Sequence, residues 1–524
     1  MPSITYDRWD VGLDRRKGAS SSEPNKLRLL TNAYITTGKQ IQKRHALKHF
    51  ATLEAGTVGL RAAGGKLNTF YETGTITHAN TTFVARKLPH PTLSQALSKI
   101  HYADMFSGYL YAVAEYAGGS IWHHYLDDDG AWAAATAYTV NTYRRPTTEN
   151  GFRYKVTAIA GSGTSGGAEP AWPTTVGATV IDNPGANQVE WTCFSPYIQD
   201  ANCPQGKAVI KAANKVWCCN DEVVDFCAAG DPRDWTTSSD AGFIPVGRNQ
   251  DGSTESLALG QFQSKLVVFF IDGAQVWTVD EDPALNALTQ RIYGVGTQFP
   301  KSPASFASDV FFLSDMGFRS ITVNTQSDNY LDVDVGSPID TLVAPTISGT
   351  DPQAIYAPGL GQYWCVIGST VWVYTFSRSA KLAAWSKYTL PFAPDGIAAL
   401  NNRLYVRHAD DVYVMDAEEY TDDGTEIAVE IVMPYGDAKQ PGILKQFWGA
   451  DVVCAGTPSI AFKYDPNDDT KESAEYDYTG DTRTGVLHPV EVACTNIAPV
   501  IRHSANEDFR LDAMTLYFNS LGVV

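Results

Sequence analysis

The stretch KLVVFFIDGAQVWTVD, residues 265–280, places the dipeptide Asp272-Gly273 between two runs of apolar and β-branched residues. Such runs are typical of β-strands, and Asp-Gly between them is a strong signal for a tight hairpin turn. We therefore expect two antiparallel strands joined at this dipeptide. Five other stretches have the same form and are also expected to be hairpins; they begin at residues 108, 215, 309, 362 and 402.

These hairpins recur at a regular interval. From residue 215 onward, successive hairpins begin 50, 44, 53 and 40 residues apart. The step of 107 residues from 108 to 215 falls to about 42 once an insertion of about 65 residues is removed. A repeated β unit of this length is typical of β-propellers, with one blade per unit. The sequence thus predicts an all-β protein with a β-propeller of six visible blades, and ragged ends could hide one more. A run of β-sandwiches, which would lack the long period, is the alternative fold.

The hairpins and the composition between them predict four regions. They are an N-terminal segment with the first propeller blades (1–130), an inserted small β-module (131–200), the remaining blades (201–420) and a C-terminal antiparallel β-sheet or sandwich domain (421–524). Helix is scarce. Its best candidate is the spacing of Leu93, Leu97 and Ile100, which would place three apolar side chains on one helix face.

The formal net charge of −18 argues against tight binding of nucleic acid, because affinity for phosphates needs clusters of Lys and Arg. DNA could still pass along an acidic wall, which would repel it rather than retain it.

The eight cysteines lack zinc-ribbon spacing, so we expect buried free thiols and synthesis in a reducing compartment. We expect no secretory signal and no membrane span, since no run of 18 apolar residues occurs.

Several short motifs suggest chemistry but lack the context it requires. Residues 161–166 spell G-x-G-x-x-G, yet prolines follow where a dinucleotide-binding helix would begin. His123 and His124 precede an Asp run at 127–129, which we interpret as a solvated turn rather than a metal site. Residues 465–470 resemble a calcium loop but lack its glycine and closing Glu. We therefore expect no catalytic, cofactor-binding or metal-binding residues, and no cofactor.

The insertion carries Tyr154, Trp172 and Trp191. These rings could stack on sugars or contact a partner. A unit of about 65 residues also needs large apolar side chains for its own core, and this is the favoured interpretation.

A resemblance to a known family rests on several stretches. They are WDVGLDRR from residue 9, LRLLTNAYITTGKQIQKRHALKHF from 27, the DWT blade end from 234, the strand pair at 265–280, and GVGTQFPKSPASFASDVFFLSDMGFRSITVN from 294. In these stretches the chain resembles the tail hub or nozzle proteins of short-tailed bacteriophages, also called packaged-DNA stabilisation proteins. The resemblance covers most of residues 1–420 and, more loosely, the final β region. The insertion departs from the simplest members.

The resemblance implies a structural virion protein rather than an enzyme. Such hubs form a homohexameric ring below the portal and the head–tail adaptor, which retains the genome and lets it leave during DNA ejection. The implied partners are further copies of the chain, the portal–adaptor complex, tail fibres or spikes, a tail needle or plug, and genomic DNA passing without sequence-specific contacts. The implied location is the virion tail, after assembly in the host bacterial cytoplasm. The alternatives are a carbohydrate-binding or glycan-cleaving β-propeller, and an ordinary propeller scaffold.

Overall fold

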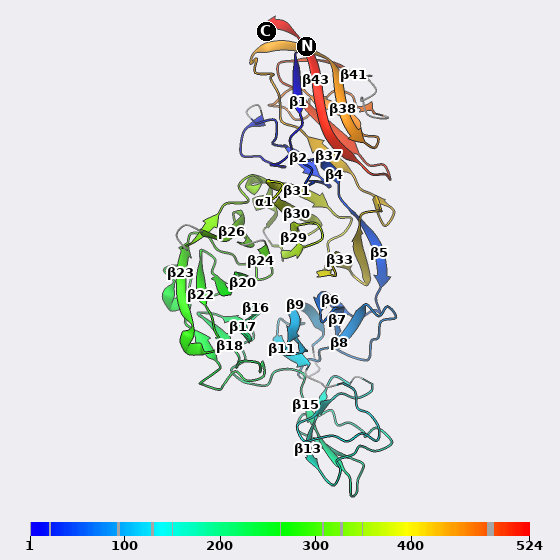
Figure 1. Ribbon diagram of the computed structural model, residues 1–524, viewed down its shortest axis with the longest axis vertical. Coiled ribbons are helices and arrows are strands. Elements are labelled where there is room, and N and C mark those ends of the chain that lie inside the picture. Colours follow the sequence, from blue (N-terminus) through cyan, green and yellow to red (C-terminus); the bar gives the residue numbers. More distant parts are fainter. Residues whose placement is uncertain are drawn as a thin grey trace.

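The computed structural model describes residues 2–523, apart from 20–21, 92–94, 127–129, 149, 263, 307–308, 325–328, 348 and 479–486. Strands dominate this part of the chain, and its one α-helix is α1 (Asp340–Ile347). The prediction of an all-β protein is therefore confirmed. Figure 1 shows an elongated molecule with both termini in sheets at one end, small sheets arranged around a centre in the middle, and a separate small sheet at the opposite end.

The middle of the molecule contains strands of seven sheets. In chain order these strands are β5 (Ala46–Thr52), β6 (Val58–Ala63), β7 (Lys66–Tyr71), β8 (Phe83–Lys87), β9 (Leu97–Phe106), β10 (Tyr109–Tyr116), β11 (Ile121–Leu126), β16 (Val209–Ala212), β17 (Lys215–Asn220), β18 (Val223–Phe226), β19 (Gly242–Ile244), β20 (Ala258–Phe262), β21 (Lys265–Phe269), β22 (Gly273–Thr278), β23 (Ala287–Tyr293), β24 (Ala304–Phe306), β25 (Asp309–Ser314), β26 (Gly317–Asn324), β27 (Asn329–Val333), β28 (Gln353–Ala357), β29 (Gln362–Ile367), β30 (Thr370–Ser377), β31 (Leu382–Thr389), β32 (Gly396–Leu400), β33 (Arg403–His408) and β34 (Asp411–Asp416). All six predicted hairpins are confirmed as antiparallel strand pairs.

The first strand of each repeated unit lies against the first strand of the next. β6 contacts β9, β9 contacts β16, and the succession continues through β20, β24, β28 and β32. β32 then contacts β6, so the series of contacts returns to its starting point. Gly396 lies at this last junction, where an added Cβ atom would stand 2.9 Å from both the Cβ and the backbone nitrogen of Leu60. A residue without a side chain is what lets β32 and β6 approach so closely.

The sheet of β32, β33 and β34 is completed by a strand from the other end of the chain. β5 pairs antiparallel with β34, with Leu47 opposite Met415. Backbone hydrogen bonds therefore join the segment that precedes β6 to the last of the repeated units.

The sheet of β6, β7 and β8 was not among the predicted hairpins. β7 pairs antiparallel with β6 but parallel with β8, which requires a connection rather than a tight turn. β6 and β7 are nevertheless joined by the two-residue turn Gly64-Gly65, a hairpin signal that the predicted pattern did not include.

The helix expected from Leu93, Leu97 and Ile100 is wrong for the two residues that the structure describes. Leu97 and Ile100 lie in β9, and Leu93 lies outside the described residues. Ile100 is buried among Phe70, Leu110 and other residues of the neighbouring strands. Pairing of β9 with β10 along its length outweighs a weak local helical spacing.

The insertion forms its own four-stranded sheet in the order β12, β13, β15, β14. These strands are β12 (Tyr143–Arg144), β13 (Arg153–Ile159), β14 (Thr179–Asp182) and β15 (Val189–Phe194). The glycine-rich loop that follows β13 leads into turns and extended backbone up to residue 178, and no helix begins there. The loop therefore lacks the helix N-terminus that a pyrophosphate group needs.

The end of the molecule that holds both termini is built from strands of the N-terminal segment and strands of the C-terminal residues. Its strands are β1 (Ser3–Tyr6), β2 (Leu29–Thr31), β3 (Ala33–Ile35), β4 (Ile41–Lys43), β35 (Thr421–Asp422), β36 (Thr425–Glu426), β37 (Val429–Val432), β38 (Ile443–Ala455), β39 (Ser459–Lys463), β40 (Tyr476–Asp477), β41 (His488–Cys494), β42 (Ala498–His503) and β43 (Arg510–Val523). β1 and β4 pair with β43, and β2 pairs with β37. The N-terminal segment is thus hydrogen-bonded into the sheets formed by the C-terminal residues. One core cluster continues from these sheets to Phe318 and Trp385 in the middle of the molecule.

Candidate functional site

Two adjoining cavities lie beside the first strands of several repeated units. The larger has a volume of about 580 Å³ and is lined by residues of β6, β9, β28 and β32 and of the loops beside them. The smaller has a volume of about 380 Å³. Lys99, Lys301, Thr350 and Asp351 line both. The two cavities therefore meet at a set of residues that contains two amines and a carboxylate.

Five Lys and Arg side chains line these cavities. Four of them form what we call the central basic cluster: Arg61, Lys99, Lys207 and Lys301; the fifth is Arg407. They come from different parts of the chain. Arg61 is in β6, Lys99 is in β9, and Lys207 and Lys301 precede β16 and β24. Lys99, Lys207 and Lys301 lie close to the start of the first strand of their units, and Arg61 lies within β6. The contacts among the first strands bring these positions together.

Two amines of the cluster share one carboxylate. The Nζ atoms of Lys301 and Lys99 lie 3.1 Å and 3.6 Å from Oδ2 of Asp351. Burial raises the pKa of Asp351, but attraction and a hydrogen bond from Lys301 outweigh it, and the net pKa is lowered. Burial lowers the pKa of Lys301, and the nearby charge of Arg61 lowers it further. The ammonium form of Lys301 is thus held in surroundings that do not fully compensate its charge.

Glu115 is the carboxylate that contacts Lys207, another member of the cluster. It lies opposite Lys99 in the β9–β10 pair, so both side chains project from one face of that sheet. Its Oε2 atom lies 2.6 Å from Nε2 of His101 and 3.4 Å from Nζ of Lys207. Burial lowers the pKa of His101 to about 4, and the positive charge of Lys301 acts in the same direction. His101 is therefore neutral at neutral pH and adds no charge to the cavity.

The guanidinium of Arg61 has carbonyl partners. Its Nη2 donates to the backbone oxygens of Ile100 and His101, at 3.3 Å and 3.0 Å. Among the described residues, no ion pair is formed by Arg61 within 4.0 Å. Burial lowers its pKa, while Asp351 acts at longer range in the opposite direction. Arg61 thus holds β9 in place and contributes positive charge to the cavity.

Arg407 lines the far side of the larger cavity but is fully engaged in holding the fold. Its Nη1 donates to the carbonyl of Gly59 at 2.7 Å, and its Nη2 donates to the carbonyl of Thr57 at 2.5 Å. Nε donates to the carbonyl of Ala409 at 2.6 Å and lies 3.6 Å from Asp395. These bonds connect β33 to β6 at the junction where the contact series returns to its start.

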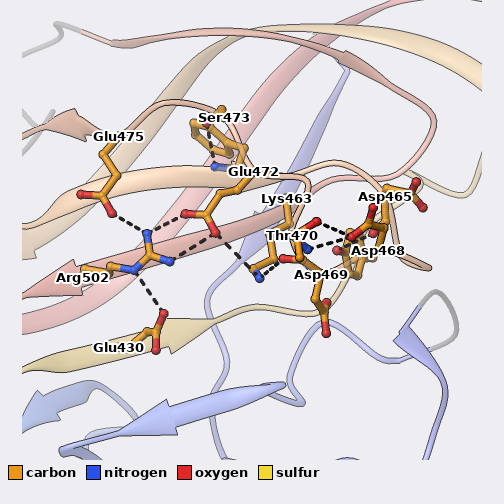
Figure 2. Close-up of polar contacts among 12 residues, drawn as sticks. Glu430, Lys463, Asp465, Asp468, Asp469, Thr470, Glu472, Ser473, Glu475 and Arg502 are labelled. Atoms are coloured by element: carbon orange, nitrogen blue, oxygen red, sulfur yellow. Dashed lines mark hydrogen bonds and ion pairs between the residues drawn. The ribbon is translucent and has the colours of Figure 1, made fainter.

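A second cluster of charged residues lies among the C-terminal strands, where Figure 2 shows Arg502 surrounded by three glutamates. Nε of Arg502 donates to Glu430 at 3.1 Å, Nη1 donates to Glu472 at 2.6 Å and to Glu475 at 2.5 Å, and Nη2 donates to Glu472 at 3.2 Å. Arg502 in β42 is in register with Glu430 in β37 and with Ser459 in β39. All three guanidinium nitrogens are used, so the network fixes the 464–475 segment to the sheet.

The calcium-like loop at 465–470 uses its oxygens internally. Asp465 accepts hydrogen bonds from the backbone of Asn467 and from Lys471, and Asp468 accepts from Thr470 (Figure 2). Within the described part of the chain, no group of three or more His, Cys, Asp or Glu side chains is arranged to hold a metal ion.

The structure places the three aromatic residues of the insertion together. Tyr154 and Trp191 are fully buried, and Trp172 is half-buried against them. The ring centroids of Tyr154 and Trp172 lie 4.3 Å apart, and those of Trp172 and Trp191 lie 5.6 Å apart. Nε1 of Trp172 donates to Glu169 at 2.8 Å. The buried rings stabilise the module, so a sugar or a partner would meet Trp172 first; the predicted contact role stays a prediction.

The two histidines that precede the Asp run lie in a strand. His123 and His124 lie in β11 and are both buried. Nδ1 of His123 lies 2.6 Å from the hydroxyl of Tyr111, and Nε2 of His124 lies 3.2 Å from the hydroxyl of Tyr116. Both histidines lie in β11, the second strand of the hairpin predicted from residue 108, and the solvated turn proposed for the Asp run stays a prediction. The Asp run at 127–129 lies outside the described residues.

Sequence reasoning missed the central basic cluster. Its members are separated by tens to hundreds of residues, and no local motif joins them. The available signal was positional, because Lys207, Lys301 and Asp351 each lie two or three residues before the first strand of a repeated unit. Aligning the units by their first strands, rather than by their hairpins, would have placed these residues at corresponding positions.

Comparisons with known proteins give little further information. No known protein family matches this chain, and no curated protein matches its sequence. Among solved structures, the chain is similar to a protein named as a 6-phosphogluconolactonase from Bacteroides uniformis, with 10% identity and a TM-score of 0.27. The similarity covers 62% of this chain and 87% of that chain. A TM-score this low carries no information on function. Among the described residues, no helix has the length and apolar composition needed to cross a lipid bilayer.

Proposed function

We propose that residues 46–416 form a seven-bladed β-propeller. The cyclic succession of contacts from β6 through β32 and back to β6 supports this arrangement. The pairing of β5 with β34 supports it further, because propellers commonly complete the last blade with a strand from the other end of the chain. The sheet of β6, β7 and β8 would be the seventh blade that the hairpin pattern did not reveal.

We propose that the chain is a structural subunit of a phage tail nozzle or hub, which forms a homohexameric ring below the portal and adaptor and is not an enzyme. The sequence resemblance over most of residues 1–420 names this class of protein. In this proposal the ring carries the genome outward, and its other contacts are tail fibres or spikes and a tail needle or plug. The net charge of −18 suits a passage along which DNA slides without being retained.

The main structural support for association into a ring is the exposure of large apolar side chains on the outer strands of two sheets. Phe243 in β19 is 59% exposed and Tyr293 in β23 is 54% exposed. Each strand is the last of its sheet and pairs on one side only. Soluble monomers rarely leave apolar residues on unprotected edge strands, because such edges associate with other chains. Contacts between neighbouring subunits would cover these residues, and side-to-side packing of identical subunits closes into a ring.

Free cysteines support the proposed place of assembly. None of the eight forms a disulfide, and seven are buried. This pattern fits a protein that folds in a reducing bacterial cytoplasm, where disulfides are rare.

Light scattering of the purified chain, alone and with a portal–adaptor complex, tests the proposal. The subunit has a mass of 57.0 kDa, so six copies would have a mass of about 342 kDa. We expect this mass alone or on the complex. A chain that stays monomeric in both mixtures would overturn the proposal.

A pair of variants tests the surface. The double variant Phe243→Lys/Tyr293→Lys should lose the ring while keeping its fold, because lysine on an edge strand opposes strand association. Met316→Lys is the matched control, since Met316 is 63% exposed but lies in the turn between β25 and β26. Equal loss of the ring in both variants would contradict the assignment of the interface to β19 and β23.

A further inference from the structure

The central basic cluster has more positive charge than the carboxylates in contact with it can balance. Asp351 is shared by Lys99 and Lys301, and Glu115 is shared by Lys207 and the neutral His101. Arg61 forms no ion pair within the described residues. Four cations of the cluster thus face two carboxylates. The fifth cation of the lining, Arg407, lies beside Asp395 and Asp410, so the lining as a whole keeps an excess of one positive charge in a protein whose overall charge is −18. A local excess of positive charge that opposes the overall balance is not explained by the fold alone.

The surroundings of the cluster disfavour the charged forms of two of its cations. The side chain of Lys301 is only 10% exposed, and burial together with Arg61 lowers its pKa. Arg61 is half-buried, and desolvation lowers its pKa as well. Buried like charges destabilise a fold unless something of opposite sign is bound between them. Their proximity is therefore better explained as a site for an anion than as a structural feature.

We propose that the cavities at the centre of the sheets bind a small phosphate-bearing anion through Arg61, Lys99, Lys207 and Lys301. A bound phosphate group would supply negative charge to balance this excess. Arg and Lys are the usual phosphate partners in proteins. The cavity volumes of about 580 Å³ and 380 Å³ lie in the range of small-molecule sites and leave room for an organic group as well as the phosphate. This site is independent of the proposed ring, because all its residues belong to one subunit.

Isothermal titration of the full-length chain in a phosphate-free buffer of low ionic strength tests the site. The two probes are inorganic phosphate and phenyl phosphate, which carries the same anionic group on an organic body. Tighter binding of inorganic phosphate would identify the free ion as the ligand, and tighter binding of phenyl phosphate would identify a phosphate ester. Absence of binding of both probes at millimolar concentration would overturn the proposal.

Variants locate the binding. Lys99 and Lys207 are 53% and 48% exposed, so Lys99→Gln and Lys207→Gln leave the core intact. Each should weaken binding by about three- to tenfold, as expected for loss of one partly solvated charge contact. Lys301→Gln, at the buried position, should weaken it more.

The matched control is Lys48→Gln. Lys48 is 51% exposed and paired with Glu419, but it lies on β5, the outer strand of its sheet, and lines neither cavity. Its variant should bind the better probe as the wild type does. If Lys48→Gln weakens binding as much as Lys99→Gln and Lys207→Gln, the effect comes from overall charge and the proposal is wrong.

Discussion

Arg44 and Asp422 form a buried two-point ion pair between segments that are 378 residues apart in the sequence. Nη1 of Arg44 donates to Oδ1 of Asp422 at 2.9 Å, and Nη2 donates to Oδ2. The same Oδ1 atom accepts a hydrogen bond from the backbone of Leu47 at 2.8 Å. Asp422 therefore positions the start of β5, the strand that completes the sheet of β32, β33 and β34.

Replacing Asp422 with asparagine should destabilise the protein strongly. Removal of one charge would leave the Arg44 guanidinium buried and unpaired, which costs about 3–5 kcal/mol in such pairs. Urea denaturation of Asp422→Asn should show this loss relative to the wild type. The control is Asp423→Asn, because Asp423 is the adjacent residue and is exposed. A similar stability of the two variants would show that the ion pair does not hold β5 in place.

Arg502→Gln should release the 464–475 segment without unfolding the sheets. Arg502 is 31% exposed, so each of its ion pairs contributes modestly, and together they fix the segment. Hydrogen exchange within 464–475 should become about fivefold faster, which corresponds to about 1 kcal/mol of local stability. Arg510→Gln is the control, since Arg510 bonds to Asp512 two residues away. Unchanged exchange in Arg502→Gln would mean that the loop is held by its internal hydrogen bonds.

The sequence predicted the local elements of this fold better than their assembly. The turn at Asp272-Gly273 is local chemistry, and the hairpin it predicts is present. Pairing of β5 with β34 and of β1 with β43 joins residues from opposite ends of the chain, and neither strand carries a mark of its distant partner. The candidate site was missed for the same reason, because Arg61 and Lys301 become neighbours only after the sheets are assembled.

The cysteines should be nearly unreactive in the folded protein. Burial raises the pKa of Cys193 to about 11 and those of Cys219, Cys227, Cys365 and Cys494 to about 12. Thiolate is the reactive form, so a chromogenic disulfide reagent at pH 8 should modify the native chain slowly. In guanidinium chloride all eight thiols should react. Rapid modification of several thiols in the native protein would contradict the burial described here.

Lys43 should make the stability of the protein depend on pH in the alkaline range. Its side chain is buried and donates to the carbonyl of Ala505 at 2.8 Å. Burial, assisted by the charge of Arg44, lowers its pKa from the ordinary value of 10.5 to about 8. Between these two values the unfolded chain binds more protons at Lys43 than the folded chain does. The contribution of Lys43 to stability must therefore rise as the pH increases from about 8 to 10.5.

The variant Lys43→Met isolates this contribution, because other groups titrate in the same range. The free energy of unfolding of the wild type minus that of Lys43→Met should increase from pH 7.5 to pH 10.5. Lys48→Met is the control with the opposite sign, since a hydrogen bond and attraction from Glu419 raise the pKa of Lys48. The free energy of unfolding of the wild type minus that of Lys48→Met should stay level from pH 7.5 to pH 10.5 and fall only at higher pH. A Lys43 difference that is flat with pH would mean that the ammonium group is solvated in the folded protein, and that burial in the sheet of β4 and β43 does not disfavour its charge.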